Sequence, residues 1–234
     1  MLVHKKGICF AAAVLGLVVV MSACGKSPEE QVYAHLEEAV SLEEDFEQQQ
    51  EPLMELEQQE QNLYEEMLTL GSEELEEIEE LADEAISYAE ERKGLLEYEK
   101  ESIEEAYEEY KLGEEQMENV EGAEEEAEAV KDAMNKRYDT YQSLYESYEK
   151  AISDDIVLYE AFTKEDLTIE ELQSHIDDVN ETYKKVVDNR DLFNEYTDDY
   201  NEAKQAFYEA SSLEITAENE GEEETSDNEE ETEE

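Results

Sequence analysis

Apart from its carboxylates, this sequence contains few side chains of the types that catalyse reactions or bind metals. His35 and His175 are the only histidines after residue 23, and Cys24 is the only cysteine there. A di-iron bundle needs a Glu-x-x-His motif on each of two helices, but Glu171 and His175 are four residues apart. No glycine-rich phosphate loop is present, and with 72 Asp and Glu residues no particular pair indicates an acid and a base. We therefore expect no enzymatic activity, no metal and no cofactor.

Cys24 is the exception, because its surroundings are typical of a cysteine that receives a lipid. Residues 4–6 are basic, residues 8–20 are apolar, and the small residues Ser22 and Ala23 directly precede the cysteine. These are the charged start, the hydrophobic stretch and the cleavage site of a secretory signal peptide. The cysteine thiol takes the diacylglycerol, and the small residues fit the lipoprotein signal peptidase.

We therefore expect residues 1–23 to be a lipoprotein signal peptide and Cys24 to be the lipidated N-terminus of the mature chain. The alternative is an uncleaved anchor, but the apolar run is shorter than the ~20 residues that a spanning helix needs. Two or more acyl chains on Cys24, palmitate among them, would make the lipid bilayer a stable partner. The expected location is the extracytoplasmic face of the cell membrane.

The charge of the chain excludes one large class of partner. Lys and Arg number 16 against 72 Asp and Glu, so the formal net charge is -56 at pH 7. Binding of nucleic acid requires cations that neutralise phosphates, so we expect no nucleic-acid partner. Anionic lipid headgroups are also unfavourable for such a chain, and attachment to the membrane must therefore come from Cys24.

The elements that must position any site are helices. Ser27, Pro28 and Glu30 form a capping box with proline at the first helical position, and Thr168 with Glu171 forms a second box. Between these signals, apolar residues recur at steps of three and four, which predicts long helices over about 28–70, 75–121, 123–162 and 169–212. Gly71 with an N-cap at Ser72 predicts a tight turn.

The predicted fold class is all-α, an elongated antiparallel bundle of four long helices over residues 24–212. Short turns favour antiparallel neighbours, and a spectrin-like three-helix packing with one projecting helix is the alternative. Pro52 predicts a kink within the first helix, over residues 48–52, without a break into two helices. Residues 213–234 contain almost nothing apolar and predict a disordered acidic tail.

Two sets of residues on the predicted seams have competing interpretations. Tyr138, Tyr141, Tyr145 and Tyr148 share one helix face, either as a stacking platform for glycans or a partner helix, or simply as core, which we favour. The second set is polar and lies where burial is expected: Gln49, Glu60, Arg92, Glu99, Arg190 and Lys204. Arg92 or Arg190 could pair with Glu60 or Glu99 to specify register, while a ligand pocket is the less favoured interpretation.

Residues 193–208, FNEYTDDYNEAKQAFY, together with residues 167–172, LTIEEL, resemble the C-terminal part of the YkyA-like cell-wall-binding lipoproteins. The resemblance extends from Cys24 to about Leu213 and implies a helical lipoprotein of Gram-positive bacteria without enzymatic activity. It brings no catalytic residues.

On this basis the expected function is that of a non-enzymatic cell-envelope binding or spacer protein, with cell-wall glycan as a possible partner. A helical adaptor that docks wall hydrolases or secretion factors is the alternative. The oligomeric state is left open.

Overall fold

In the computed structural model, residues 26–211 of the 234-residue chain are described. The predicted signal peptide (residues 1–23), Cys24 and the predicted acidic tail (residues 213–234) lie outside the described residues. Over the described range the regular elements are α1 (Pro28–Leu42), α2 (Glu44–Met67), the 3-10 helix η1 (Ser72–Glu74), α3 (Leu75–Met117), α4 (Glu124–Phe162) and α5 (Ile169–Ala210).

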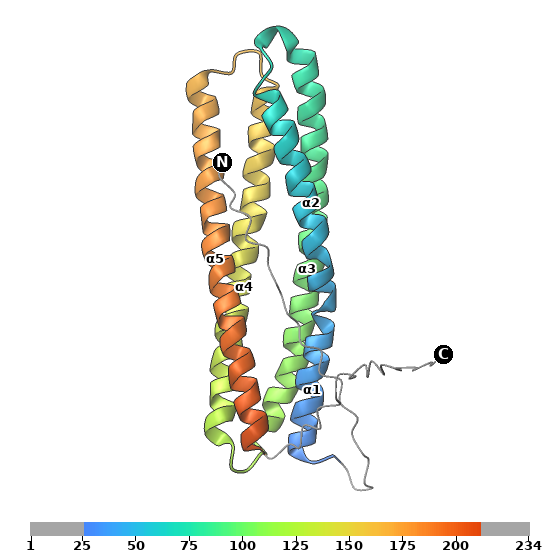
Figure 1. Ribbon diagram of the computed structural model, residues 1–234, viewed down its shortest axis with the longest axis vertical. Coiled ribbons are helices and arrows are strands. Elements are labelled where there is room, and N and C mark those ends of the chain that lie inside the picture. Colours follow the sequence, from blue (N-terminus) through green and yellow to red (C-terminus); the bar gives the residue numbers. More distant parts are fainter. Residues whose placement is uncertain (1–25, 212–234) are drawn as a thin grey trace, which may run out of the picture. The chain divides into compact units, whose positions relative to one another are not determined.

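The helices run alternately up and down, and α1 continues into α2 along the same line, so four long helical segments lie side by side (Figure 1). The 43 residues of α3 correspond to about 65 Å at 1.5 Å per residue. The predicted all-α, elongated four-helix bundle is confirmed, and the spectrin-like three-helix alternative is not formed.

Both predicted capping boxes are present. The Ser27 hydroxyl accepts from the Glu30 N–H at 3.2 Å, and the Glu30 carboxylate accepts from the Ser27 N–H at 2.9 Å. Thr168 and Glu171 make the same reciprocal pair at the start of α5. Each box satisfies backbone donors that the first turn of a helix leaves without partners.

The turn between α2 and α3 forms at the predicted place, but its capping residue differs from the prediction. Gly71, and not Ser72, occupies the N-cap position of η1, and the Glu74 carboxylate accepts from its N–H at 2.9 Å. The carboxylate reaches back from the third residue of η1 and satisfies this backbone donor. The N-cap predicted at Ser72 is therefore wrong by one residue.

The first helical segment is interrupted at Glu43, and the prediction of a single helix kinked over residues 48–52 is wrong. α2 runs through Pro52, although proline lacks the N–H that would bond one turn back. At the actual break, Ser102 of α3 inserts its hydroxyl between two backbone groups. It donates to the Leu42 carbonyl at 2.7 Å and accepts from the Phe46 N–H at 3.1 Å. Insertion of a side chain into the hydrogen-bond ladder is a recognised cause of helix breaks.

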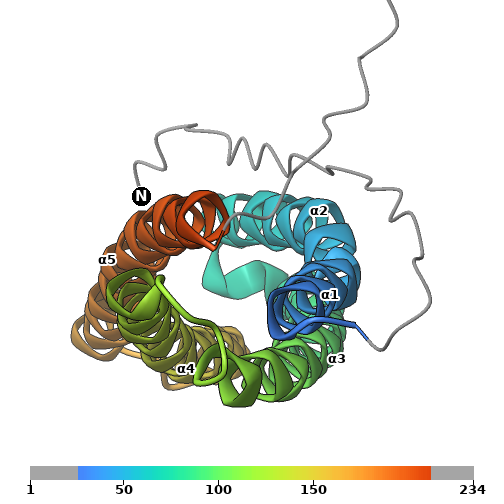
Figure 2. The same cartoon turned by 90° about the horizontal axis from the view of Figure 1, so that it is seen from below.

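Seen along its axis, the bundle is a ring in which α1 with α2, then α3, α4 and α5 follow one another (Figure 2). The most extensive backbone packing joins α4 to α5 and α1 and α2 to α3. The bundle therefore consists of two halves, which we call the α1–α3 half and the α4–α5 half. The α1 and α2 helices meet α5 mainly through side chains, among them Glu37 with Tyr208 and Lys204.

Candidate functional site

Polar residues inside the bundle provide most of its unusual chemistry. Of the polar seam residues, Glu60, Arg92 and Glu99 are buried. Gln49, Arg190 and Lys204 are only partly buried. The predicted pair between Arg92 and Glu60 is confirmed. The alternative partner, Arg190, does not reach either glutamate and bonds its neighbour Asp191.

Arg92 lies at the centre of a layer that draws on α2, α3, α4 and α5. Its Nη1 atom donates to the two Glu60 carboxylate oxygens at 2.9 and 3.0 Å and to Asp155 Oδ2 at 3.3 Å. Its Nη2 atom donates to Glu57 at 3.1 Å and to the Tyr183 hydroxyl at 2.9 Å. The side chain of Arg92 is 1% exposed and that of Glu60 is 2% exposed, so this ion pair is removed from water.

Tyrosine hydroxyls complete the coordination of these carboxylates. Tyr183 donates to Asp155 at 2.6 Å and Tyr148 donates to Glu57 at 2.5 Å. Tyr159 donates to Glu60 at 3.4 Å. We call this set the Arg92 layer; its members are Glu57, Glu60, Arg92, Tyr148, Asp155, Tyr159 and Tyr183. The carboxylates of the layer are thus hydrogen-bonded, whereas the buried Nε of Arg92 has no hydrogen-bond partner among the described residues.

The Arg92 layer contains three carboxyl groups and one cation. Burial raises the pKa of Glu60 to about 7, and the attraction of Arg92 offsets only part of this shift. Burial likewise raises the pKa of Asp155 to about 6, again against the opposing effect of Arg92. The guanidinium therefore does not compensate both buried carboxylates, and the layer favours retaining a proton near neutral pH.

Glu99 is buried without a cation. Its carboxylate accepts from the Gln50 amide at 2.9 Å, and Tyr141 lies beside it. Burial raises its pKa to about 8, and the neighbouring Gln50 and Tyr141 lower it only in part. Of the two glutamates considered as partners of an arginine, Glu99 is the one that does not form the pair, and its raised pKa favours the protonated form at neutral pH.

A second buried arginine, Arg137, was missed by the sequence analysis. It donates to both oxygens of Glu43 at 2.7 and 2.6 Å, and its Nε donates to Thr197 at 2.9 Å. With Ser102, these residues form the Arg137 layer at the break between α1 and α2. A signal was available, because Arg137 follows Val130 and Met134 at steps of four and three. Tyr138, one residue on, was assigned to the seam instead.

The tyrosine stripe of α4 belongs mainly to the core. Tyr141 is fully buried against Phe46 and Phe193, which agrees with the favoured interpretation. Tyr138, Tyr145 and Tyr148 are partly buried. Tyr145 packs under the Lys100 ammonium, and Tyr138 stacks on Tyr107 with ring centroids 3.7 Å apart. Tyr148 instead directs its hydroxyl to Glu57 within the Arg92 layer.

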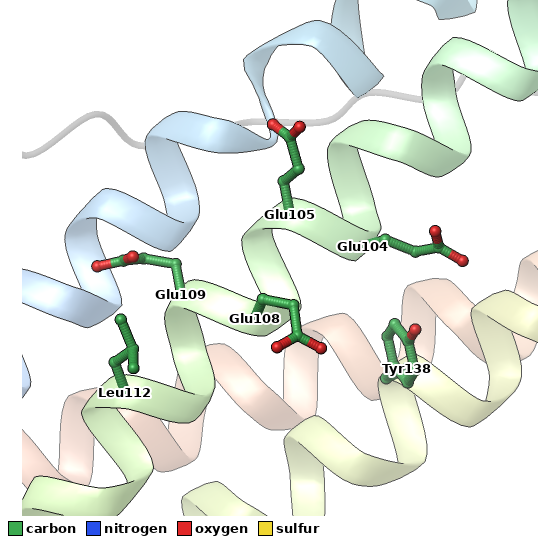
Figure 3. Close-up of a pocket in the computed structure, with 6 residues that line it drawn as sticks. All are labelled: Glu104, Glu105, Glu108, Glu109, Leu112 and Tyr138. Carbon is green, nitrogen blue, oxygen red and sulfur yellow. The ribbon is translucent and has the colours of Figure 1, made fainter.

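A shallow hollow of about 500 Å³ lies on the outside of the bundle between α3 and α4. Its lining consists of Glu104, Glu105, Glu108, Glu109, Leu112 and Tyr138 (Figure 3). Carboxylates beside an aromatic ring favour a positively charged group. His35 Nδ1 lies 2.6 Å from Glu109 Oε1 at the margin of this hollow. His175 lies near the start of α5, at the opposite end of the bundle from His35. The two histidines are therefore not brought together.

Two larger features are absent from the described residues. Among residues 26–211, no group of three or more His, Cys, Asp or Glu side chains is arranged to hold a metal ion. None of the described helices has an apolar stretch long enough to cross a membrane.

The fold and its interior define a long antiparallel four-helix bundle whose ionisable groups are joined across the core. The chain belongs to the YkyA family, described as "Putative cell-wall binding lipoprotein", which matches residues 27–210. It is 29% identical over 214 residues to "Uncharacterized lipoprotein YkyA" of Bacillus subtilis (strain 168), covering 91% of this chain and 96% of that relative. The family resemblance found in the sequence is therefore confirmed.

A solved structure shares the fold. It is a conserved protein of unknown function from Staphylococcus aureus, which aligns with a TM-score of 0.54 and 14% sequence identity. The alignment covers 77% of this chain and 93% of that one. At this identity the similarity concerns the arrangement of the helices alone.

Proposed function

We propose that this lipoprotein is anchored by acylated Cys24 to the extracytoplasmic face of the cell membrane and acts as a non-enzymatic binding or spacer element of the cell envelope. The observation that carries the proposal is the family match over residues 27–210, whose description combines a lipid anchor with binding to the cell wall. The signal-peptide pattern of residues 1–23 supports the same location.

The course of the chain supports a spacer role. α1 begins four residues after Cys24, so an acyl group on that cysteine would attach the bundle by the end at which α1 begins. The turns between α2 and α3 and between α4 and α5 lie at the other end (Figure 1). A rigid segment of about 65 Å would then separate these turns from the lipid.

Electrostatic attraction alone cannot bring this acidic chain to the cell wall. Gram-positive walls contain anionic polymers such as teichoic acids, and a chain of net charge -56 is repelled by them over a Debye length of about 8 Å at physiological salt. Divalent cations that bridge carboxylates to phosphates would overcome this repulsion, because Ca²⁺ prefers clustered oxygen ligands. Stacking on glycan rings is the uncharged route.

A sedimentation assay on purified cell wall tests the proposal. Residues 24–234 carrying Cys24→Ser, and therefore free of lipid, are mixed with wall that retains or lacks teichoic acid, with and without Ca²⁺. Retention that a chelator reverses would support cation bridging, and retention on stripped wall would support glycan contact. Absence of retention in every condition would refute direct wall binding.

The adaptor role is supported by apolar side chains at the end opposite the start of α1. Ile169 at the start of α5 is 83% exposed and Leu68 after α2 is 49% exposed. If this end docks another envelope protein, Ile169→Ser with Leu68→Ser will remove specific cross-linked partners from cells. The exposed mid-helix variant Val187→Ser is the control and will retain them. Identical cross-linking patterns for both variants would refute the adaptor role.

A further inference from the structure

The interior of the bundle connects its two halves through ionisable groups. In the Arg92 layer, Arg92 of α3 bonds Asp155 of α4 and Tyr183 of α5, while Tyr148 of α4 bonds Glu57 of α2. These bonds cross from the α1–α3 half to the α4–α5 half. The α2 and α5 helices have little direct backbone packing, and these bonds join them together with apolar contacts such as Phe46 against Phe193.

The same contacts carry an excess of negative charge. Arg92 faces the buried carboxyl groups of Glu60 and Asp155, and the carboxylate of Glu57 at the edge of the layer is 39% exposed. Glu99 lies about two helical turns further along α3 with an amide and a phenol as neighbours. Fully ionised, these sites would place unpaired carboxylates in the core, which is strongly unfavourable.

We propose that the Arg92 layer and Glu99 form a proton-dependent latch, which holds the two halves of the bundle together while protonated and loosens them when its protons leave. The latch goes beyond the proposed envelope function. In an extracytoplasmic protein it would make the closed state of the bundle respond to the pH of the medium.

The neighbours of each titrating group come from every helix packed against it. Around Glu60 and Asp155 they are Glu57 of α2, Arg92 of α3, Tyr148 and Tyr159 of α4, and Tyr183 of α5. Around Glu99 they are Gln50 of α2 and Tyr141 of α4. Among these neighbours Arg92 is the one permanent cation, so ionisation of a second carboxyl group is not neutralised in place.

The difference in proton binding between the closed and the open bundle gives the direction and size of the pH dependence of opening. An opened core exposes Glu99 to water, where its pKa returns toward 4.5 from about 8 in the closed bundle. The closed state therefore binds a proton that the open state releases, and the opening constant rises by about tenfold per pH unit between about pH 5 and pH 7. Glu60, with a pKa of about 7, adds a similar dependence below about pH 6.5.

Hydrogen exchange followed by mass spectrometry measures this opening. The chain of residues 24–234 with Cys24→Ser is exchanged between about pH 5.5 and pH 8.5, and rates are corrected for the intrinsic pH dependence of amide exchange. About 0.5 M NaCl suppresses the contribution of surface carboxylates. Peptides from α2 and α5 report separation of the two halves.

Matched variants assign the effect to the latch. Glu99→Gln and Glu60→Gln keep the shape of each side chain but cannot release a proton, and Glu101→Gln changes an exposed carboxylate of the same helix. We expect Glu99→Gln to reduce the slope by about tenfold per pH unit and Glu101→Gln to leave it unchanged. A merely structural role for Glu99 would shift protection equally at all pH values.

Two results would overturn the latch. One is corrected protection of α2 and α5 that does not depend on pH in the unmodified chain. The other is a slope that remains unchanged in both Glu99→Gln and Glu60→Gln. Because the two variants lie in different parts of the core, either one alone decides the matter if the other fails to fold by circular dichroism.

Discussion

Arg92 is the side chain on which the largest buried polar network of the bundle depends. Its replacement by leucine removes the cation beside Glu60 and Asp155 and breaks the bond to Tyr183. We expect Arg92→Leu to lower the free energy of unfolding by about 3–5 kcal/mol, as for other buried ion pairs that lose one partner. Urea unfolding followed by circular dichroism measures this loss.

A double variant distinguishes loss of the pair from loss of packing. If uncompensated charge is the main cost, Arg92→Leu combined with Glu60→Leu will be less destabilised than the sum of the single variants, by about 0.5–3 kcal/mol. Strict additivity would mean that the two side chains contribute independently and would contradict the network. Loss of less than about 1 kcal/mol in Arg92→Leu alone would contradict it as well.

At the same scale, the sequence predicted which polar residues face the core better than it predicted their partners. Glu60, Arg92 and Glu99 were identified because they continue the three-four spacing of apolar residues. Spacing along one helix contains no information about which residue of another helix lies opposite, so it could not show that Glu99 lies opposite Gln50 and not opposite an arginine. Arg190 continues the same spacing, but it is only partly buried and bonds its neighbour Asp191.

At the scale of the helix, two glycines of α3 have opposite surroundings. A Cβ atom added at Gly94 would meet nothing within 4 Å, whereas one added at Gly113 would lie 3.1 Å from the Cβ of His35 on α1. We expect Gly94→Ala to stabilise the bundle by about 0.5–1 kcal/mol, because alanine is the better helix former. Gly113→Ala is expected to be destabilising, because α1 must move away from α3.

The two glycine variants control each other, since both make the same chemical change in the same helix. Thermal unfolding of both proteins side by side is the measurement. A stabilised Gly113→Ala would show that α1 does not need its close approach to α3. A Gly94→Ala variant without any gain would show that helix propensity at this position does not limit the stability of α3.

The break between α1 and α2 depends on a single hydroxyl group. Ser102→Ala removes the hydroxyl that donates to the Leu42 carbonyl and accepts from the Phe46 N–H. We expect a loss of about 1–3 kcal/mol, the usual cost of buried polar groups that lose a hydrogen bond. Ser143→Ala, which removes an exposed hydroxyl on α4, is the control and should change stability little. Equal effects in chemical unfolding would refute the bridging role.

This break also explains one limit of the sequence analysis. Helix starts were predicted correctly because the capping boxes at Ser27 and Thr168 are local, with both partners within four residues. The position of the break was not, because its cause, Ser102, is far along the chain from Glu43. Pro52 was the stronger local signal, yet α2 continues through it.

At the scale of the whole molecule, the negative charge is unevenly distributed. No lysine or arginine occurs between Lys26 and Arg92, so α1, α2 and the first part of α3 carry acidic charge alone. Part of this charge is compensated from inside the bundle, where Arg92 pairs with Glu60 of α2 and Arg137 pairs with Glu43. Cations in the solvent must screen what remains on the outside.

The stability of the bundle should therefore rise with salt. Screening weakens repulsion between exposed carboxylates, and we expect the unfolding temperature to increase by several degrees between about 0.02 M and about 0.5 M NaCl. A variant that replaces four exposed carboxylates of α2 with glutamine, at Glu44, Glu47, Glu51 and Glu55, should start higher and gain less. Buried pairs such as Arg92 with Glu60 are little screened and cannot produce this difference.

A stability that is flat or falls with salt in the unmodified chain would show that surface repulsion is not the dominant electrostatic effect.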